Sequence, residues 1–363
     1  MNQTEKEITE YISKDKYRKK MGLPAEVTEE YRLLAQGEYN RNYLFKHPSD
    51  GRELVLRINY GSQMHLKHQI EYEANALKLL EKSGRTAHVY YVDGLFDAPG
   101  EGVLVMDYLP GRNLDYKSAG DLKGAAECLA DIHSVIISEK DIMPAASDAL
   151  PADADRLIAP DGTMKAILSE CEDMLSVYMC SDLPADDKKR RLRKLLDDAW
   201  KLASDEQASP YRCCINTELN STNFLVEESD DFPLKVRLVD WEKPLYGDPA
   251  QDLAHFLAPT TTFWKTDVVF GNDKTENFID MYIDAVNGRF DTEGLRERTL
   301  AMIPVTCLRG MTWCAMAWIQ YRNSDKELVN QSTADKLEQY LCDEFISDIE
   351  IRVKSALTGG ECR

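Results

Sequence analysis

Residues 215–226 read INTELNSTNFLV, and a second stretch at residues 239–254 reads VDWEKPLYGDPAQDLA. The first places Asn223 directly before an apolar run, and the second places Asp240 directly after one. Taken alone, Asn223 would be an ordinary turn former and Asp240 an ordinary helix cap. Their order, with a short strand between them, argues instead that the two side chains act together.

Length and composition describe an ordinary folded protein. The chain has 363 residues, of which 43% are hydrophobic and 29% are charged, and this suffices for two sizeable cores. Its formal net charge of -19 disfavours nucleic acid and anionic lipid, so a phosphate-bearing ligand would need a local pocket of opposite sign. Neither a signal-peptide core nor an apolar run of about 18 residues is evident. We therefore expect a cytoplasmic protein that contacts neither membrane nor nucleic acid.

The pattern of apolar residues changes along the chain. Before the break at Pro110 and Gly111 it predicts a helix at about 64–83 and strands at 31–35, 42–45, 54–58, 88–92 and 103–106. Beyond the break the pattern is mostly helical, and short β runs return only around 223–226 and 236–239.

These features predict an α+β fold of two lobes. The first is a small β-rich lobe at 1–107, followed by a hinge from Asp107 to Gly111. The second is a larger, mainly helical lobe at 108–363, with a helical insertion at about 140–210.

The predicted helix carries a buried charge. Leu66, Ile70, Leu77 and Leu80 share one helical face with Glu73, so this carboxylate lies within an apolar stripe. Burying it without a partner would cost several kcal/mol, roughly the penalty for a buried ion. Arg57, which interrupts the apolar run at 54–58, is the candidate partner. The alternative is a slightly rotated helix that exposes Glu73 to solvent.

The order of these parts resembles a known fold and a known family. A glycine turn at 36–42, a strand with an internal cation, a helix with an inward Glu and a hinge resemble the small lobe of a protein-kinase-like fold. The stretches at 215–226 and 239–254 resemble the aminoglycoside phosphotransferase and choline kinase family. That family has His-x-Asp-x-x-x-x-Asn, an apolar strand that ends in Asp, and Gly-Asp-Pro-x-x-Asp-Leu-Ala. The resemblance runs from about Leu33 to Trp318.

The resemblance implies a nucleotide and a metal. Asn223 and Asp240 match the ligands of Mg²⁺, which neutralises the phosphates of ATP or GTP in such reactions. The remaining cofactor-binding residues that it implies are Gly37 and Asn40 in the glycine turn, the pair Arg57 and Glu73, and Asp107 and Leu109 at the hinge.

Three positions depart from the family pattern. Glu218 stands where the family has its catalytic Asp, Asn216 where it has His, and Arg57 where it has Lys. Each replacement keeps the charge or the hydrogen-bonding capacity of the side chain. The Glu carboxylate, however, reaches about 1 Å farther, and a misplacement of that size can cost about a hundredfold in rate. Asp252 is expected to face inward and brace the loop, and Asp248 to cap a helix that begins with Pro249.

The acceptor is the least specified part. Trp313 and Trp318 lie five residues apart on a predicted helix, hence on different faces, and one could line a cleft. Together with an acid such as Glu242, which could also bind a second ion or be solvated, an aromatic face suits a cationic acceptor. Both tryptophans could equally be core residues. Choline-like, aminoglycoside-like and neutral sugar acceptors all fit.

Two functions are therefore compatible with the sequence. In the first, the protein is a small-molecule kinase that transfers the γ-phosphate of ATP or GTP to an acceptor hydroxyl, with Glu218 as the base and Asn216 beside it. In the second, it is a pseudokinase, a nucleotide-binding or scaffold module with little or no phosphotransfer. Retention of both metal ligands favours the kinase, because a scaffold has no physical need for them.

Overall fold

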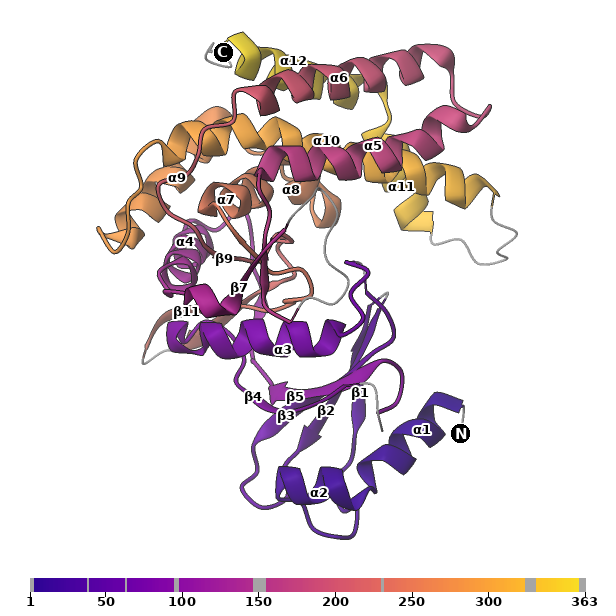
Figure 1. The fold of residues 1–363 in the computed structure, drawn as a ribbon, viewed down its shortest axis with the longest axis vertical. Helices are drawn as coiled ribbons and strands as arrows, with labels where there is room; N and C mark the ends of the chain where they lie inside the picture. Colours follow the sequence, from indigo (N-terminus) through magenta and orange to yellow (C-terminus); the bar gives the residue numbers. More distant parts are fainter. Residues whose placement is uncertain are drawn as a thin grey trace.

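The computed structural model describes residues 3–37, 39–62, 64–94, 98–145, 155–229, 232–323 and 331–358. A five-stranded antiparallel sheet and the helices around it form one end of the molecule, and a stack of long helices forms the other (Figure 1). The mixed α and β content agrees with the predicted fold class.

The sheet is built from the N-terminal strands in the order β1-β2-β3-β5-β4. Its elements and their neighbours are α1 (Gln3–Ile12), α2 (Asp15–Met21), β1 (Arg32–Gln36), β2 (Asn40–Lys46), β3 (Glu53–Asn59), α3 (Gln69–Leu80), β4 (Val89–Asp93) and β5 (Gly102–Asp107). Alternate residues of β3 face opposite sides of the sheet. Leu54, Leu56 and Ile58 pack against α1 and α2. Arg57 faces the other side, toward α3.

All five predicted strands of this part are present within two residues of their expected ends. The helix begins later than predicted, at Gln69 rather than at about residue 64. His65 has φ 57, a left-handed conformation that an α-helix does not contain. Leu66 therefore lies in the turn before α3, where it is nevertheless buried.

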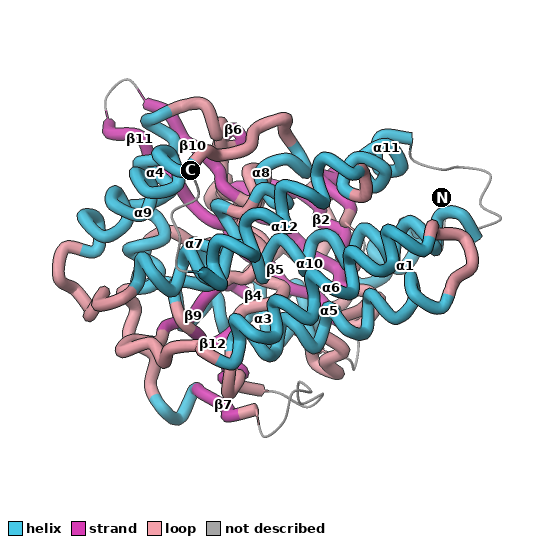
Figure 2. The backbone as a smooth tube through the Cα atoms, turned by 90° about the horizontal axis from the view of Figure 1, so that it is seen from above, coloured by secondary structure: helices cyan, strands magenta, loops and turns pink. Residues whose placement is uncertain are grey.

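The remainder of the chain is mainly helical, as predicted. Its helices are α4 (Ala119–His133), α5 (Thr163–Cys180), α6 (Asp186–Ser204), α7 (Pro249–Leu257), α8 (Pro259–Lys265), α9 (Asn272–Val286), α10 (Leu295–Asn323), α11 (Gln331–Tyr340) and α12 (Asp343–Thr358). The long helix α10 packs against α5, α7, α8, α11 and α12. Figure 2 shows α5, α6, α10 and α12 running side by side over the rest of the chain.

The expectation that β structure returns only near 223–226 and 236–239 is wrong. Besides β10 (Phe224–Ser229) and β11 (Phe232–Leu238), the structure has β6 (Arg112–Asn113), β7 (Ile142–Pro144), β8 (Leu157–Ala159), β9 (Cys213–Ile215) and β12 (Leu245–Gly247). β6 joins β10 and β11, β9 pairs with β12, and β7 pairs with β8. Strands of two or three residues are too short for a period-two pattern to reveal them.

Tyr72 connects α3 to the helical part. Its hydroxyl donates to Pro244 O at 2.7 Å and accepts the backbone N–H of Ile158 at 3.1 Å. Met64, Leu66 and Ile158 pack around the same ring. These contacts fix the sheet-bearing end against the segment that follows Asp240.

One helix of the described residues, α10, is long and apolar enough to cross a membrane, although the sequence pattern suggested that there was none. Its most apolar window is 67% buried inside the protein. A helix surrounded by α5, α7 and α8 has the environment of a core helix, so length and composition alone are weak evidence for a span.

Candidate active site

The loop at 216–223 lies between β9, which the sequence pattern did not predict, and β10, which it did. β9 ends at Ile215, and β10 begins at Phe224 and pairs with β11, which ends two residues before Asp240. The backbone N–H of Val239 donates to Asn223 O at 2.9 Å. Strand pairing thus brings Asn223 and the segment around Asp240 side by side, as their order in the sequence suggested.

A strained turn is held in place by Asp252. Thr217 has φ 69, an uncommon conformation for a β-branched residue, and such strain is typical of functional loops. The buried Asp252 carboxylate accepts the backbone N–H groups of Asn216 at 2.8 Å and Thr217 at 2.7 Å. His133 Nε2 lies 3.2 Å from the same carboxylate. The predicted bracing role of Asp252 is confirmed, as is the predicted cap, since Asp248 accepts the N–H of Ala250 at 2.9 Å.

Asn216 links the loop to the Asp240 segment. Its Nδ2 donates to Asp240 O at 2.8 Å, and its Oδ1 accepts the N–H of Glu218 at 3.1 Å. Asn223 Nδ2 donates to Glu218 O at 2.8 Å, which leaves the amide oxygen as its available metal ligand. The structure therefore brings Asn216, Glu218, Asn223 and Asp240 together.

The charges around Asp240 suit a divalent cation. Burial raises the pKa of Asp240 and the nearby Glu218 carboxylate adds to the rise, whereas Arg57, 3.8 Å away, opposes it. Asp240 has φ 66, a conformation that Asp and Asn tolerate. No cluster of three or more His, Cys, Asp or Glu side chains suited to a metal occurs among the described residues. An ion held by one carboxylate, an amide oxygen and substrate phosphates is the usual arrangement for Mg²⁺, so the donor set fits.

The predicted ion pair between Arg57 and Glu73 is present and buried. Arg57 Nη1 lies 2.5 Å from Glu73 Oε1, and Arg57 Nε donates to Asn42 Oδ1 at 3.0 Å. Burial raises the pKa of Glu73, although Arg57 opposes the rise. The second oxygen, Glu73 Oε2, is buried without a hydrogen-bond partner in the described part of the chain. Glu73 therefore faces inward, and the solvent-exposed alternative is wrong.

Replacing Glu73 with glutamine should lower the free energy of unfolding by about 3–5 kcal/mol, because it removes the charge that compensates the buried Arg57. Urea unfolding followed by circular dichroism measures the loss. The double substitution of Arg57→Met with Glu73→Leu should cost less than Glu73→Gln, since neither member of the buried pair is then left without the other. A single substitution that costs less than the double one would contradict this account.

Glu242 sits between the two parts of the site. Its side chain accepts a hydrogen bond from Asn40 Nδ2, and its backbone oxygen accepts one from Gln69 Nε2 at 2.7 Å. Burial and the neighbouring Asp240 raise the pKa of Glu242 to about 8. Glu242 is thus not a plain surface acid, and its assignment to the acceptor side stays a prediction.

Binding of Mg²⁺ beside Glu242 should depend on pH. With a pKa of about 8, the metal-free carboxyl is largely protonated at pH 6 and about half ionised at pH 8. Since a cation prefers the ionised form, the apparent affinity for Mg²⁺ should rise over this interval and binding should release a proton. Calorimetry in two buffers of different ionisation enthalpy measures the release. Two results would contradict this prediction. One is an apparent affinity for Mg²⁺ that does not change between pH 6 and pH 8.5. The other is a Glu242→Gln variant whose affinity depends on pH as steeply as that of the wild type.

The glycine turn and the hinge have the expected positions in the fold. Gly37 N–H donates to Asn40 O at 2.9 Å, and Asn40 Oδ1 accepts from Asn59 Nδ2 at 2.9 Å. Glu38, which follows Gly37 in the predicted turn, lies outside the described residues. A Cβ at Gly37 would lie 3.9 Å from Asn40 O, an ordinary van der Waals contact, so the fold does not require glycine there.

At the hinge, Asp107 is occupied by structural contacts. Its carboxylate accepts the N–H of His88 at 3.1 Å and the hydroxyl of Tyr90 at 2.8 Å. Tyr108 N–H donates to Glu53 O at 3.1 Å. The half-buried Leu109, by contrast, has a backbone without hydrogen bonds to the described residues, as a segment that meets a nucleobase requires.

The two tryptophans of α10 have different surroundings. Trp313 is 36% exposed and packs edge-on against Trp264 of α8, with ring centroids 5.4 Å apart. Trp318 donates from Nε1 to Glu338 at 2.7 Å and packs against Tyr178, on the side of α10 that meets α5 and α11. Trp313 therefore stays a candidate for the acceptor side of the site, whereas Trp318 is part of the packing between helices.

Sequence reasoning missed three charged residues near Glu218, namely Lys243, Arg309 and Glu170. Lys243 Nζ and Arg309 Nη2 each lie 3.8 Å from Glu218 Oε1, and Glu170 lies against both cations. Arg309 interrupts an apolar helix in the sequence and could have been noticed for that reason. Glu170 lies within the predicted insertion and gave no such signal.

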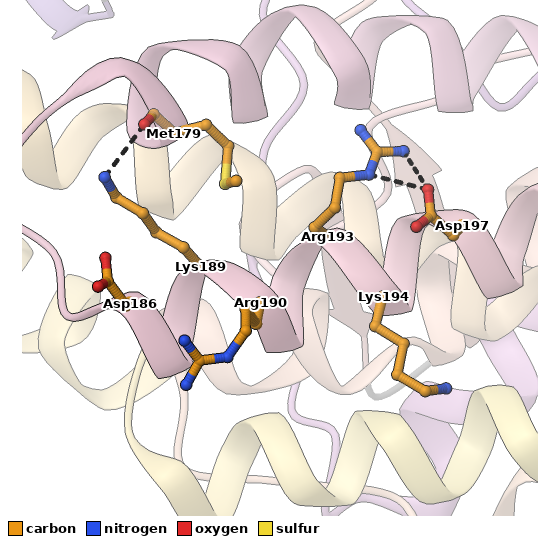
Figure 3. A pocket seen from close by; sticks show the side chains of 7 residues that line it. All are labelled: Met179, Asp186, Lys189, Arg190, Arg193, Lys194 and Asp197. Carbon is orange, nitrogen blue, oxygen red and sulfur yellow. Dashed lines mark hydrogen bonds and ion pairs between the residues drawn. The ribbon is translucent and has the colours of Figure 1, made fainter.

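Two surface depressions lie away from these residues. One, of about 370 Å³, runs along α6 and contains Lys189, Arg190, Arg193 and Lys194 (Figure 3). Arg193 pairs with Asp197 within the same helix, and Lys189 bonds to Met179 O, so these two cations already have partners within the protein. The other, of about 290 Å³, lies between α3 and β8. Neither carries a group of the candidate site.

Comparison with known proteins identifies the family. Residues 30–298, well over half of the chain, match the model of the phosphotransferase enzyme family called APH, and the chain belongs to this family. It is therefore a phosphotransferase by family, as the motifs suggested. No curated protein matches the sequence.

Solved structures share the fold at low sequence identity. A spectinomycin phosphotransferase in complex with ADP and spectinomycin has 10% identity and a TM-score of 0.59, covering 90% of this chain and 93% of its own. Plasmodium vivax ethanolamine kinase has 16% identity and a TM-score of 0.58, covering 88% and 83%. Amicoumacin kinase with AMP-PNP and Ca²⁺ has 14% identity and a TM-score of 0.55, covering 88% and 87%. The predicted protein-kinase-like fold is confirmed.

Proposed function

We propose that the protein is a magnesium-dependent small-molecule kinase that transfers the γ-phosphate of ATP or GTP to a hydroxyl of an amino sugar, amino alcohol or sugar. The observation that carries the proposal is the meeting of Glu218, Asn223 and Asp240 at the ends of paired strands, with Arg57 3.8 Å from Asp240. The division into lobes at 1–107 and 108–363 and a cytoplasmic location are part of the same proposal.

The side chains have distinct tasks in this mechanism. Asp240 and the amide oxygen of Asn223 would hold Mg²⁺, which neutralises the charge of the nucleotide phosphates when bound. Arg57, fixed by Glu73, faces the same space from the sheet. Glu218 accepts the proton of the acceptor hydroxyl, and Asn216 holds the Glu218 backbone. Because positioning and charge supply most of the acceleration in such reactions, a Glu in place of Asp is compatible with turnover.

Part of the site changes when nucleotide binds under this proposal. The hydrogen bond between Asn40 and Glu242 joins the glycine turn to the Asp240 segment across the space that phosphates would occupy. A triphosphate therefore has to separate these two side chains, which would free Asn40 for a phosphate and Glu242 for the metal side.

A thermal-shift screen tests the proposal. ATP and GTP with Mg²⁺ are crossed with aminoglycosides, choline, ethanolamine and neutral sugars, and stabilising combinations are then assayed for ADP or GDP release. A ligand at 100 times its Kd adds about 2.7 kcal/mol to stability, which shifts Tm by several degrees. Magnesium-dependent stabilisation without turnover for any acceptor would favour a nucleotide-binding pseudokinase. No nucleotide stabilisation at all would overturn the kinase and leave only the scaffold role.

A further inference from the structure

The proposed base has cationic neighbours that the mechanism above does not use. Lys243 Nζ and Arg309 Nη2 both lie 3.8 Å from the same atom, Glu218 Oε1. Glu170 joins the two cations, because its carboxylate lies 2.6 Å from Arg309 Nε and 3.6 Å from Lys243 Nζ. Two carboxylates and two cations thus alternate in one group, here called the base cluster: Glu218, Lys243, Arg309 and Glu170.

The cluster is assembled from separate parts of the fold. Lys243 lies just beyond the Asp240 segment, and its backbone oxygen accepts the Thr217 hydroxyl at 2.9 Å, which ties it to the strained turn. Arg309 is on α10, next to Gly310. A Cβ at Gly310 would lie 2.7 Å from the side chain of Thr260, so this glycine lets α10 approach α8 closely. Glu170 comes from α5, which packs along α10.

The charges in the cluster are partly withdrawn from water. The exposed fraction of the side chain is 9% for Lys243, 20% for Arg309 and 27% for Glu218, whereas Glu170 at the outer side is 46% exposed. Burial tends to raise the pKa of Glu170, but Arg309 and Lys243 outweigh this effect and lower it to about 2. Glu170 therefore stays ionised throughout the neutral range and holds both cations. Partly buried charges of this kind interact more strongly than exposed ones.

Glu218 has a particular need for such neighbours. Glutamate has one more rotatable bond than the aspartate usual at this position, so an unrestrained carboxylate would sample positions about 1 Å or more from the productive one. Both cations lie 3.8 Å from Oε1, which is beyond hydrogen-bond distance, so they attract the carboxylate by charge. This attraction limits the positions of the side chain without using up a hydrogen-bond site that the acceptor hydroxyl needs.

We infer that Lys243, Arg309 and Glu170 are positioning residues that hold Glu218 in its working geometry, with Glu170 acting through the two cations. The inference rests on the proposed function, in which Glu218 is the base. It gives helix α5 a part in the active site, although the sequence suggested only an insertion there. The three residues could have two other roles, which would give different experimental results. One is a purely structural ion pair between α5 and α10, and the other is a binding site for an anionic acceptor.

Stability measurements test the coupling without requiring activity. Tm is measured for the wild type, Glu218→Gln, Arg309→Met and the double variant. If Arg309 holds Glu218, the double variant should lose at least about 1–2 °C less than the sum of the single losses, as contacting charges do. The control cycle pairs Glu218→Gln with Arg193→Met on α6 and should be additive. An additive Arg309 cycle overturns the inference.

Kinetics with the acceptor found by the thermal-shift screen test the positioning itself. In Lys243→Met and Glu170→Gln, kcat should fall about tenfold to a hundredfold, the cost of a misplaced group, while KM for nucleotide and acceptor changes less than about twofold. Lys243→Arg should recover most of the loss because it keeps the charge. Glu172→Gln, on the same helix but paired with Arg193 and Trp200, is the matched control and should retain wild-type kcat.

The remaining outcomes separate the two proposals. A raised acceptor KM with unchanged kcat in Lys243→Met overturns the inference, because the cations would then bind the acceptor. Equal loss in Lys243→Met and Lys243→Arg also overturns it, since a structural tie would not be rescued by charge. A wild-type protein without turnover for any acceptor overturns the proposed function instead, while the Tm cycle still reports whether the cluster holds Glu218.

Discussion

Replacing Asp240 with asparagine should abolish magnesium-dependent nucleotide binding and lower turnover about a thousandfold. A bound metal contributes several kcal/mol of charge stabilisation, and about 4 kcal/mol corresponds to this factor. Asparagine suits the test because it tolerates the left-handed backbone at this position, where φ is 66. The measurements are ADP release and the Tm shift caused by nucleotide with and without Mg²⁺.

The same variant should keep or slightly gain stability in the absence of ligand. Burial raises the pKa of Asp240, so the ionised form is disfavoured in the folded state and destabilises it at pH values above the unfolded pKa. Removing the charge removes this cost. The control is Asp197→Asn on α6, whose carboxylate pairs with Arg193 far from the loop. If Asp240→Asn folds and retains magnesium-dependent binding, Asp240 is not the main metal ligand. If the variant is markedly less stable, the account of the Asp240 charge is wrong.

Much of the fold could be predicted because the apolar pattern of a long segment indicates which of its residues are buried. The apolar run at 54–58 predicted β3, and the one charge within it predicted the partner of Glu73, now seen at 2.5 Å. A buried carboxylate needs a cation whatever the rest of the fold is, so this argument required no knowledge of tertiary structure.

The strands that shape the site could not be predicted in the same way. β9 and β12 have three residues each, and their pairing of Ile215 with Leu245 closes the segment that carries the candidate site. Such short strands exist because of tertiary pairing and have no intrinsic signal. The left-handed φ of Thr217 is likewise imposed by Asp252 and Lys243 rather than by the preference of threonine.

The base cluster could not be predicted from the sequence either, because it also depends on tertiary packing. Glu170 and Arg309 are 139 residues apart, and nothing near Glu170 distinguishes it from the other acids of α5. Their meeting depends on the packing of two long helices, which a hydrophobic pattern specifies only as faces. The family resemblance gave no help, because the motifs it rests on end before α10 and lie outside α5.

Glu218 gives the second large effect. Glu218→Gln should lower kcat by a factor of about 10²–10⁴, the usual contribution of a general base, while magnesium-dependent nucleotide binding remains. The backbone of Glu218 should be undisturbed, because its N–H and C=O are held by Asn216 and Asn223, and glutamine keeps the shape of the side chain. Single-turnover measurements at saturating nucleotide isolate the chemical step. Loss of nucleotide binding in this variant would mean that Glu218 has another role.

Glu218→Asp, which restores the residue usual in the family, should lower kcat rather than raise it. The loop backbone is fixed by Asp252, Asn216 and Asn223, so the shorter side chain cannot be compensated by a shift of the chain. Its carboxylate would be about 1 Å short of the acceptor, which costs about a hundredfold. It would also withdraw from Lys243 and Arg309. A gain in kcat would instead mean that the site is built for aspartate and that the glutamate impairs it, as the pseudokinase account requires.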